Sequence, residues 1–67
     1  MKYYLIDLER SMRTGSIYYW KPNKFGYTTD LREAGLYDEK EAKDIVDDDI
    51  DKRTVLVSEL TVKNILK

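Results

Sequence analysis

Residues Trp20 to Ala42, WKPNKFGYTTDLREAGLYDEKEA, restrict the backbone more than any other part of this chain. The stretch holds the only Trp, Pro and Phe and two of the three Gly. Pro22 has no backbone N–H and a fixed φ, so it predicts the end of a preceding strand. A turn follows, in which Asn23 or Gly26 supplies a left-handed conformation. Gly26 and Gly35 each come where the chain must turn, so both are predicted to be backbone requirements.

The second half of this stretch carries the local signals of a helix over about residues 38–48. Asp38 is a favourable N-cap, and Glu41 stands three residues later, where a capping-box partner belongs. Acidic residues at 47–49 are unfavourable at the negative end of the helix dipole, so the helix is expected to end near them. A narrow apolar stripe lies between these ends at helical spacing: Ala42, Ile45 and Val46.

Alternating and β-branched segments outside this helix predict the strands. Residues 2–9 alternate with a period of two, which is typical of a half-buried strand. Residues 16–21 and 53–58 are rich in aromatic or β-branched side chains and predict two further strands. Residues 27–29 predict a short extended piece. The polar segment 10–16 contains a glycine and predicts a hairpin connection between the first two strands.

The C-terminal segment, residues 59–67, favours a short helix capped by Ser58, although a strand that continues through Val62 competes with it. The predicted fold class is α+β, with a small antiparallel sheet of three to four strands packed against one main helix and a possible short C-terminal helix. Residues 1–67 are expected to form a single domain, because one core needs most of so short a chain. The side chains that the C-terminal helix would bury are Leu60, Val62 or the stem of Lys63, Ile65 and Leu66.

The small size of the chain limits its stability. A core of this size rarely supplies more than about 3–5 kcal/mol, so such domains usually need a disulfide, a metal or a partner subunit. The chain has no Cys and no His, which excludes a disulfide and removes the usual zinc ligands. Idealised packing or self-association remains, and a homodimer is expected. Neither a signal peptide nor an apolar span of roughly 20 residues is visible, which predicts a cytoplasmic location without a membrane.

The residue inventory argues against catalysis. Nucleophile–base pairs usually need His or Cys, so we predict neither enzyme activity nor a cofactor. Asp47, Asp49 and Asp51 have the spacing of the first three ligands of an EF-hand calcium loop. However, Lys52 stands at the required glycine position and Ser58 at the position of the bidentate Glu. We therefore predict no metal site, and interpret the acidic run as a solvated helix end or an acidic docking surface.

Six Tyr, one Trp and one Phe are many aromatic residues for so short a chain. Neighbouring side chains on a strand point to opposite faces, so some of Tyr3, Tyr18 and Trp20 are expected outside the core. The sequence leaves open a two-sided core, a protein interface or a surface that stacks single-stranded bases. A net charge of −1 does not favour nucleic acid. The candidate partner-binding residues are an aromatic and basic group, Tyr18, Trp20, Lys21, Lys24, Phe25, Tyr27 and Arg32, and an acidic group, Asp47, Asp48, Asp49 and Asp51.

One pattern covers about a third of the chain and consists of Trp20, Pro22-Asn23, Gly26-Tyr27-Thr28, Ala34-Gly35, Tyr37 and Glu41-Ala42. This pattern resembles a group of short uncharacterised accessory proteins encoded by bacteriophages and prophages. The resemblance implies a non-catalytic protein, in the cytoplasm of a bacterial host, that binds and inhibits or modulates a host protein during host takeover or counter-defence. The alternative is a nucleic-acid-binding regulator that uses an aromatic and basic face. A third hypothesis is a protein that sequesters a small molecule, which would need a pocket between two subunits.

Overall fold

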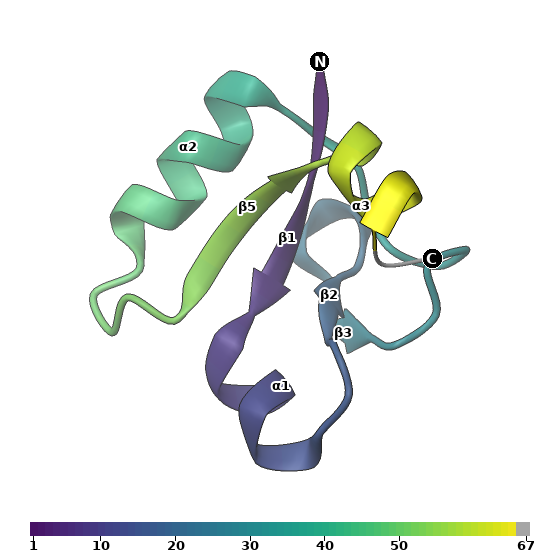
Figure 1. Cartoon of the computed structure of the whole chain (residues 1–67). Helices are drawn as coiled ribbons and strands as arrows, with labels where there is room; N and C mark the ends of the chain where they lie inside the picture. Colours follow the sequence, from purple (N-terminus) through teal and green to yellow (C-terminus); the bar gives the residue numbers. More distant parts are fainter. Residues whose placement is uncertain (66–67) are drawn as a thin grey trace.

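The first strand, β1 (Lys2–Asp7), is the centre of the sheet (Figure 1). The computed structural model describes residues 1–65, with side chains for residues 1–64. One edge of β1 pairs antiparallel with β5 (Thr54–Ser58), from Tyr3 opposite Ser58 to Asp7 opposite Thr54. The four residues from Tyr4 to Asp7 are all buried, whereas most of β5 is only half-buried. The sequence of β1 therefore supplies the middle of the core.

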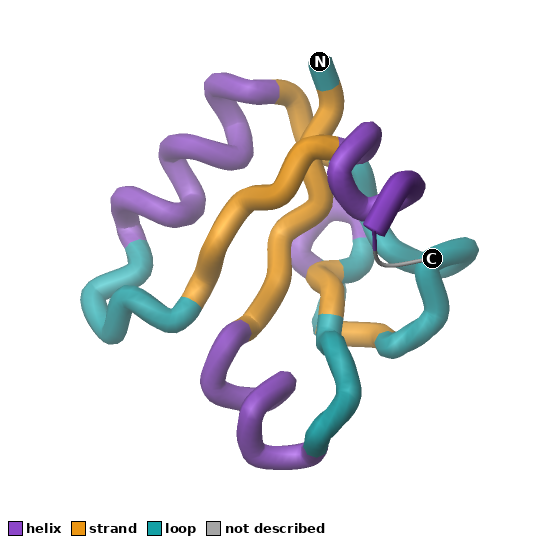
Figure 2. The backbone as a smooth tube through the Cα atoms, viewed as in Figure 1, coloured by secondary structure: helices purple, strands orange, loops and turns teal. Residues whose placement is uncertain are grey.

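The opposite edge of β1 is covered by two short strands that lie end to end. β2 (Tyr19–Trp20) pairs with β1 at Ile6, and β4 (Tyr37–Asp38) pairs with it at Tyr3 and Lys2. Together they act as one strand that is interrupted by residues 21–36, which we call the excursion. If β2 continued in register, Pro22 would lie opposite Tyr3, where it has no N–H to donate. The chain leaves the sheet there and returns at Tyr37 (Figure 2).

Within the excursion, β3 (Tyr27–Thr28) folds back to pair with β2. The turn between them includes the short 3-10 segment η1 (Pro22–Lys24), in which Asn23 and Lys24 have positive φ. Gly26 follows with a φ of 103°. The predicted turn with a left-handed Asn23 or Gly26 is confirmed, because both residues take that conformation. Within residues 1–65 the sheet contains five strands, and the predicted α+β class is confirmed.

Two helices cover the two faces of the sheet (Figure 1). Helix α2 (Glu39–Asp48) begins at the Asp38 cap, whose side chain accepts the backbone N–H of Glu41 at 2.8 Å. Its predicted limits are confirmed. Helix α3 (Glu59–Ile65) packs on the other face, and the Ser58 hydroxyl accepts the backbone N–H of Thr61. The predicted C-terminal helix, with Ser58 as its cap, is therefore also confirmed.

The alternation along β1 builds a core on each face. Leu5 faces α2 and packs with Tyr37, Ala42 and Ile45. Tyr4 and Ile6 face the other side, where they pack with Tyr19 and Val62 of α3. Three tyrosines are thus core residues, and a two-sided core accounts for part of the aromatic content. The prediction that Leu60 is buried is wrong, because it is 60% exposed, while the side chains of Ile65 and Leu66 lie outside the described residues.

Residues 8–14 form a helix, α1 (Leu8–Thr14), where the sequence predicted a strand end and a hairpin connection. The Asp7 side chain caps this helix by accepting the backbone N–H of Arg10 at 3.0 Å. Gly15 ends it with a φ of 79°, and its N–H donates to the carbonyl of Ser11. These two local caps are stronger than the weak alternation that Leu8 and Glu9 continue. The second strand is also shorter than the predicted 16–21, and β4 was not predicted.

The two ends of the excursion are held together at a neck. The N–H of Gly35 donates to the carbonyl of Trp20 at 2.9 Å. The Tyr37 hydroxyl donates to the carbonyl of Lys21 and accepts the backbone N–H of Lys24 at 3.1 Å. At Gly35 the two chain segments approach so closely that a Cβ would lie 2.7 Å from the nitrogen of Pro22. The neck therefore requires a glycine at this position.

Gly35→Ala is expected to lower the free energy of unfolding by about 1–3 kcal/mol, the usual cost of overpacking against atoms that cannot move away. Urea unfolding followed by the fluorescence of the single Trp measures the change. Glu33→Ala, at an exposed position in the same excursion, is the control and should change stability by less than about 0.5 kcal/mol. Equal effects of the two substitutions would contradict the steric explanation.

Tyr37→Phe is expected to cost about 1–3 kcal/mol, because it leaves the carbonyl of Lys21 and the N–H of Lys24 without their hydroxyl partner. Thermal and urea unfolding report the loss. Tyr18→Phe removes the same atom from a half-buried ring outside the excursion and is the matched control. A Tyr37→Phe protein as stable as the wild type would show that the hydroxyl does not hold the neck.

Candidate functional site

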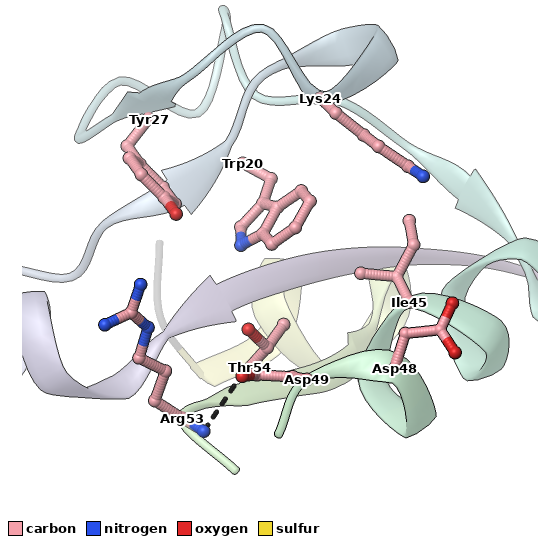
Figure 3. Close-up of a pocket in the computed structure, with 8 residues that line it drawn as sticks. All are labelled: Trp20, Lys24, Tyr27, Ile45, Asp48, Asp49, Arg53 and Thr54. Atoms are coloured by element: carbon pink, nitrogen blue, oxygen red, sulfur yellow. Dashed lines mark hydrogen bonds between the residues drawn. The ribbon is translucent and has the colours of Figure 1, made fainter. Parts of the chain in front are cut away.

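A pocket of about 270 Å³ opens between the excursion and the end of α2 (Figure 3). One wall comes from β2, η1 and β3, and the other comes from α2, the loop after it and the beginning of β5. Segments that are far apart in the sequence therefore form a single site. The lining residues are Trp20, Lys24, Tyr27, Ile45, Asp48, Asp49, Arg53 and Thr54.

The aromatic wall consists of Trp20 and Tyr27, which pair across β2 and β3. Their rings are 5.9 Å apart and nearly perpendicular, an edge-to-face arrangement that aromatic pairs favour. The indole Nε1 of Trp20 is buried and has no hydrogen-bond partner among the described residues. In Figure 3 this nitrogen is directed across the pocket toward the side of Arg53 and Thr54. The wall of the pocket thus contains a buried donor.

Two arginines lie near the aromatic wall, and one of them contacts it. The guanidinium of Arg10 lies 4.5 Å from the centre of the Tyr27 ring and 5.8 Å from that of Tyr18, within cation–π range. Arg53 approaches Asp7 at 4.0 Å and Glu9 at 3.5 Å. The charge of Asp7 is the main reason that the pKa of Arg53 is raised above its ordinary value. Arg53 is therefore a positioned cation at the pocket.

Asp49 organises the loop on the acidic side of the pocket. Its carboxylate accepts the backbone N–H groups of Asp51 and Arg53, both at 3.1 Å (Figure 3 shows the second). The pKa of Asp49 is lowered below its ordinary value. The main cause is a hydrogen bond from the Thr54 side chain, and the hydrogen bonds from these backbone groups add to it. Lys52 takes a φ of 56° within this loop. The carboxylate thus stabilises the connection from α2 to β5.

The structure divides the predicted binding residues into those at the pocket and those elsewhere. Trp20, Lys24 and Tyr27 from the aromatic and basic group meet Asp48 and Asp49 from the acidic group. The sequence suggested two separate surfaces, and the pocket joins part of each. The other predicted residues do not line the pocket: Tyr18, Lys21, Phe25, Arg32, Asp47 and Asp51.

The structure shows what surrounds four of these six residues. Tyr18 contacts Arg10, Lys21 belongs to the neck, and Arg32 pairs with Asp30 at 2.9 Å. Phe25 is 78% exposed beside the pocket residue Lys24. Sequence reasoning missed four residues of the site and its surroundings, namely Arg10, Ile45, Arg53 and Thr54. Only the position of Arg53, two residues after the acidic run, suggested that it could join the acidic group.

Comparisons with protein-family models, curated proteins and solved structures found no match to this chain. The likeness to phage accessory proteins therefore stays a prediction. Within the part of the chain that the structure describes, no group of three or more acidic side chains is placed to hold a metal ion. In the same residues, no helix has the length and apolar character needed to cross a bilayer.

Asp49→Asn is expected to lower the melting temperature at neutral pH and to have less effect in acid. A carboxylate with a lowered pKa in the folded state stabilises the fold above its unfolded pKa, near 3.8, and loses this effect as the pH falls through the folded value. The difference in melting temperature between the wild type and Asp49→Asn should therefore become smaller below about pH 4. Thermal unfolding between neutral and acidic pH measures it, with exposed Asp47→Asn as the control. A difference in melting temperature that does not change with pH would contradict this role of the Asp49 carboxylate.

Proposed function

We propose that this chain is a non-catalytic binding protein of the phage accessory type, which binds a host protein through the pocket and inhibits or modulates it. The observation that carries this proposal is the unpaired, buried indole N–H of Trp20 in the pocket wall. A buried donor without a partner costs about 1–3 kcal/mol, so this N–H would gain from an acceptor. A partner that brings a hydrogen-bond acceptor into the pocket supplies one.

The size of the pocket supports a protein partner. Small-molecule sites usually enclose about 300–1,000 Å³. At about 270 Å³, this open pocket lies near the lower limit of that range, where a single side chain of a partner would fit. The proposed contact is one inserted side chain with an oxygen acceptor, such as that of Glu, Gln, Asp or Asn, opposite the indole N–H of Trp20.

Exposed apolar side chains next to the pocket support the same kind of partner. Phe25, 78% exposed, directly follows the pocket residue Lys24. Ile50, 90% exposed, directly follows Asp49 on the other wall. Protein interfaces combine large apolar and aromatic side chains, which become buried, with a polar rim. We call Phe25, Ile50 and the pocket residues the binding face.

The charges of the binding face disfavour the nucleic-acid alternative. Lys24 and Arg53 provide two cations, but Asp48 and Asp49 place two carboxylates on the same pocket. A phosphate backbone binds best to a groove of one positive sign, because its affinity depends mainly on cations that replace its counterions. A balanced set of charges is better matched to a protein surface that carries both signs.

The expected result is that a host protein binds the binding face and shifts the emission of the only Trp, which lines the pocket. The partner is first captured from a bacterial lysate, then purified and titrated against this protein by fluorescence. Phe25→Asp and Ile50→Asp should each raise the dissociation constant by about tenfold or more, because a few anchor residues carry most of the binding energy of an interface. Met12→Asp is the control, since Met12 is 82% exposed on α1.

The same titration with a single-stranded oligonucleotide tests the alternative function. Binding at low salt that falls steeply as salt rises, and that Trp20→Ala removes, would replace the proposal with a nucleic-acid regulator. A host protein whose affinity is reduced as much by Met12→Asp as by Ile50→Asp would also contradict the binding face.

A further inference from the structure

Arg53 is held in place through both its backbone and its side chain. Its backbone N–H donates to Asp49 at 3.1 Å, and its carbonyl accepts the N–H of Leu8. Its guanidinium approaches Asp7 through Nε and Glu9 through Nη1. The side chain is nevertheless 40% exposed and lines the pocket. This guanidinium is therefore both positioned and accessible.

The two acidic contacts of Arg53 leave hydrogen-bonding capacity in its guanidinium. The distances, 4.0 Å to Asp7 and 3.5 Å to Glu9, exceed the roughly 2.7–2.9 Å of a charge-assisted hydrogen bond. A guanidinium has five N–H donors, and among the described side chains no carboxylate pairs with its third nitrogen, Nη2. The planar fork of an arginine matches the two oxygens of a carboxylate, so Arg53 can bind a further one.

The arginines at this end of the pocket outnumber the carboxylates that they meet. Glu9 is shared between Arg53 at 3.5 Å and Arg13 at 3.1 Å, and Asp7 approaches the first of these. Arg10 adds a third guanidinium, 4.5 Å from the centre of an aromatic ring in the pocket wall. Three guanidinium groups therefore meet two carboxylates here, and one further carboxylate would balance the charge.

The carboxylates of the pocket itself are directed elsewhere. Asp49 accepts backbone N–H groups of the loop after α2, together with the hydroxyl and backbone N–H of Thr54. In Figure 3 Asp48 lies on the α2 side, across the pocket from Arg53. The Tyr27 hydroxyl, in contrast, is directed toward the side of Arg53 in the same view. Donors thus converge where the acidic groups of the pocket do not.

We propose that the side chain inserted by the host protein is a carboxylate, Glu or Asp, bound by the guanidinium of Arg53 and the hydroxyl of Tyr27. This inference rests on the proposed function and narrows it, because that proposal accepts Gln and Asn as well. A carboxylate brings acceptors only, whereas an amide brings two N–H donors of its own. A site whose unused groups are donors therefore selects the carboxylate.

An NMR titration of the isotope-labelled full chain tests this chemistry without a host protein. The probes are the side-chain analogue N-acetylglutamate N-methylamide and its uncharged glutamine counterpart, at equal ionic strength. The only Trp gives a single indole N–H signal and lines the pocket. The glutamate analogue should shift this signal with a dissociation constant on the order of 1–10 mM, as expected for a ligand of this size. The glutamine analogue should bind about tenfold more weakly or less.

Three variants test the residues that hold the carboxylate. Arg53→Lys keeps the charge beside Asp7 and Glu9 but loses the fork, and Tyr27→Phe removes only the hydroxyl. Each should raise the dissociation constant of the glutamate analogue by about tenfold. Lys24→Arg, which also exchanges one cation for another in this pocket, is the matched control and should change it by less than about twofold. Circular dichroism checks that each variant is folded.

Equal binding of the two analogues would overturn the proposal, and so would a glutamate affinity that neither Arg53→Lys nor Tyr27→Phe lowers. No shift with either analogue up to about 0.1 M would overturn it as well. A host protein that binds the binding face in that case would leave the proposed function standing. Binding of the glutamate analogue without any captured host protein would support the carboxylate site and count against the proposed function.

Discussion

The contact between Gly35 and Pro22 is the constraint on which the rest of this structure depends. Pro22 cannot donate to β1, so β2 must stop, and the absence of a side chain at Gly35 lets the returning chain pass directly beside it. The hydrogen bonds of Tyr37 then fix the two sides of the neck. A short chain thus completes the second edge of β1 with two pieces of two residues each, which would be too short to pair stably without the neck.

The neck also explains why a pocket exists. The residues of the excursion leave the sheet instead of continuing along it. The turn between β2 and β3 then places Lys24 and Tyr27 opposite the end of α2. Trp20 belongs both to the core and to the pocket, because it packs against the core on the α2 face and also lines the pocket. The buried donor is a consequence of this double position, since the core fixes the ring and so fixes where the N–H must point.

The sequence predicted well those parts of the fold that local chemistry decides. The helix at 38–48 has its cap, its apolar stripe and its end within a few residues, and the structure agrees at both ends. The helix α1 was missed because Leu8 and Glu9 continue the alternation of β1, although Asp7 and Gly15 carried the signals of its caps. β2, β4 and the pocket depend on contacts between distant segments, so no window of sequence contains their cause.

Arg53 joins the pocket to the centre of the sheet. Its guanidinium lines the pocket and is held by Asp7 and Glu9, while its backbone carbonyl accepts the N–H of Leu8. The position of this cation is therefore set by the end of β1 and the beginning of α1, and not by the pocket alone. A carboxylate brought into the pocket by a partner would meet a guanidinium that is already held in place, so less side-chain freedom would be lost on binding than with a free arginine.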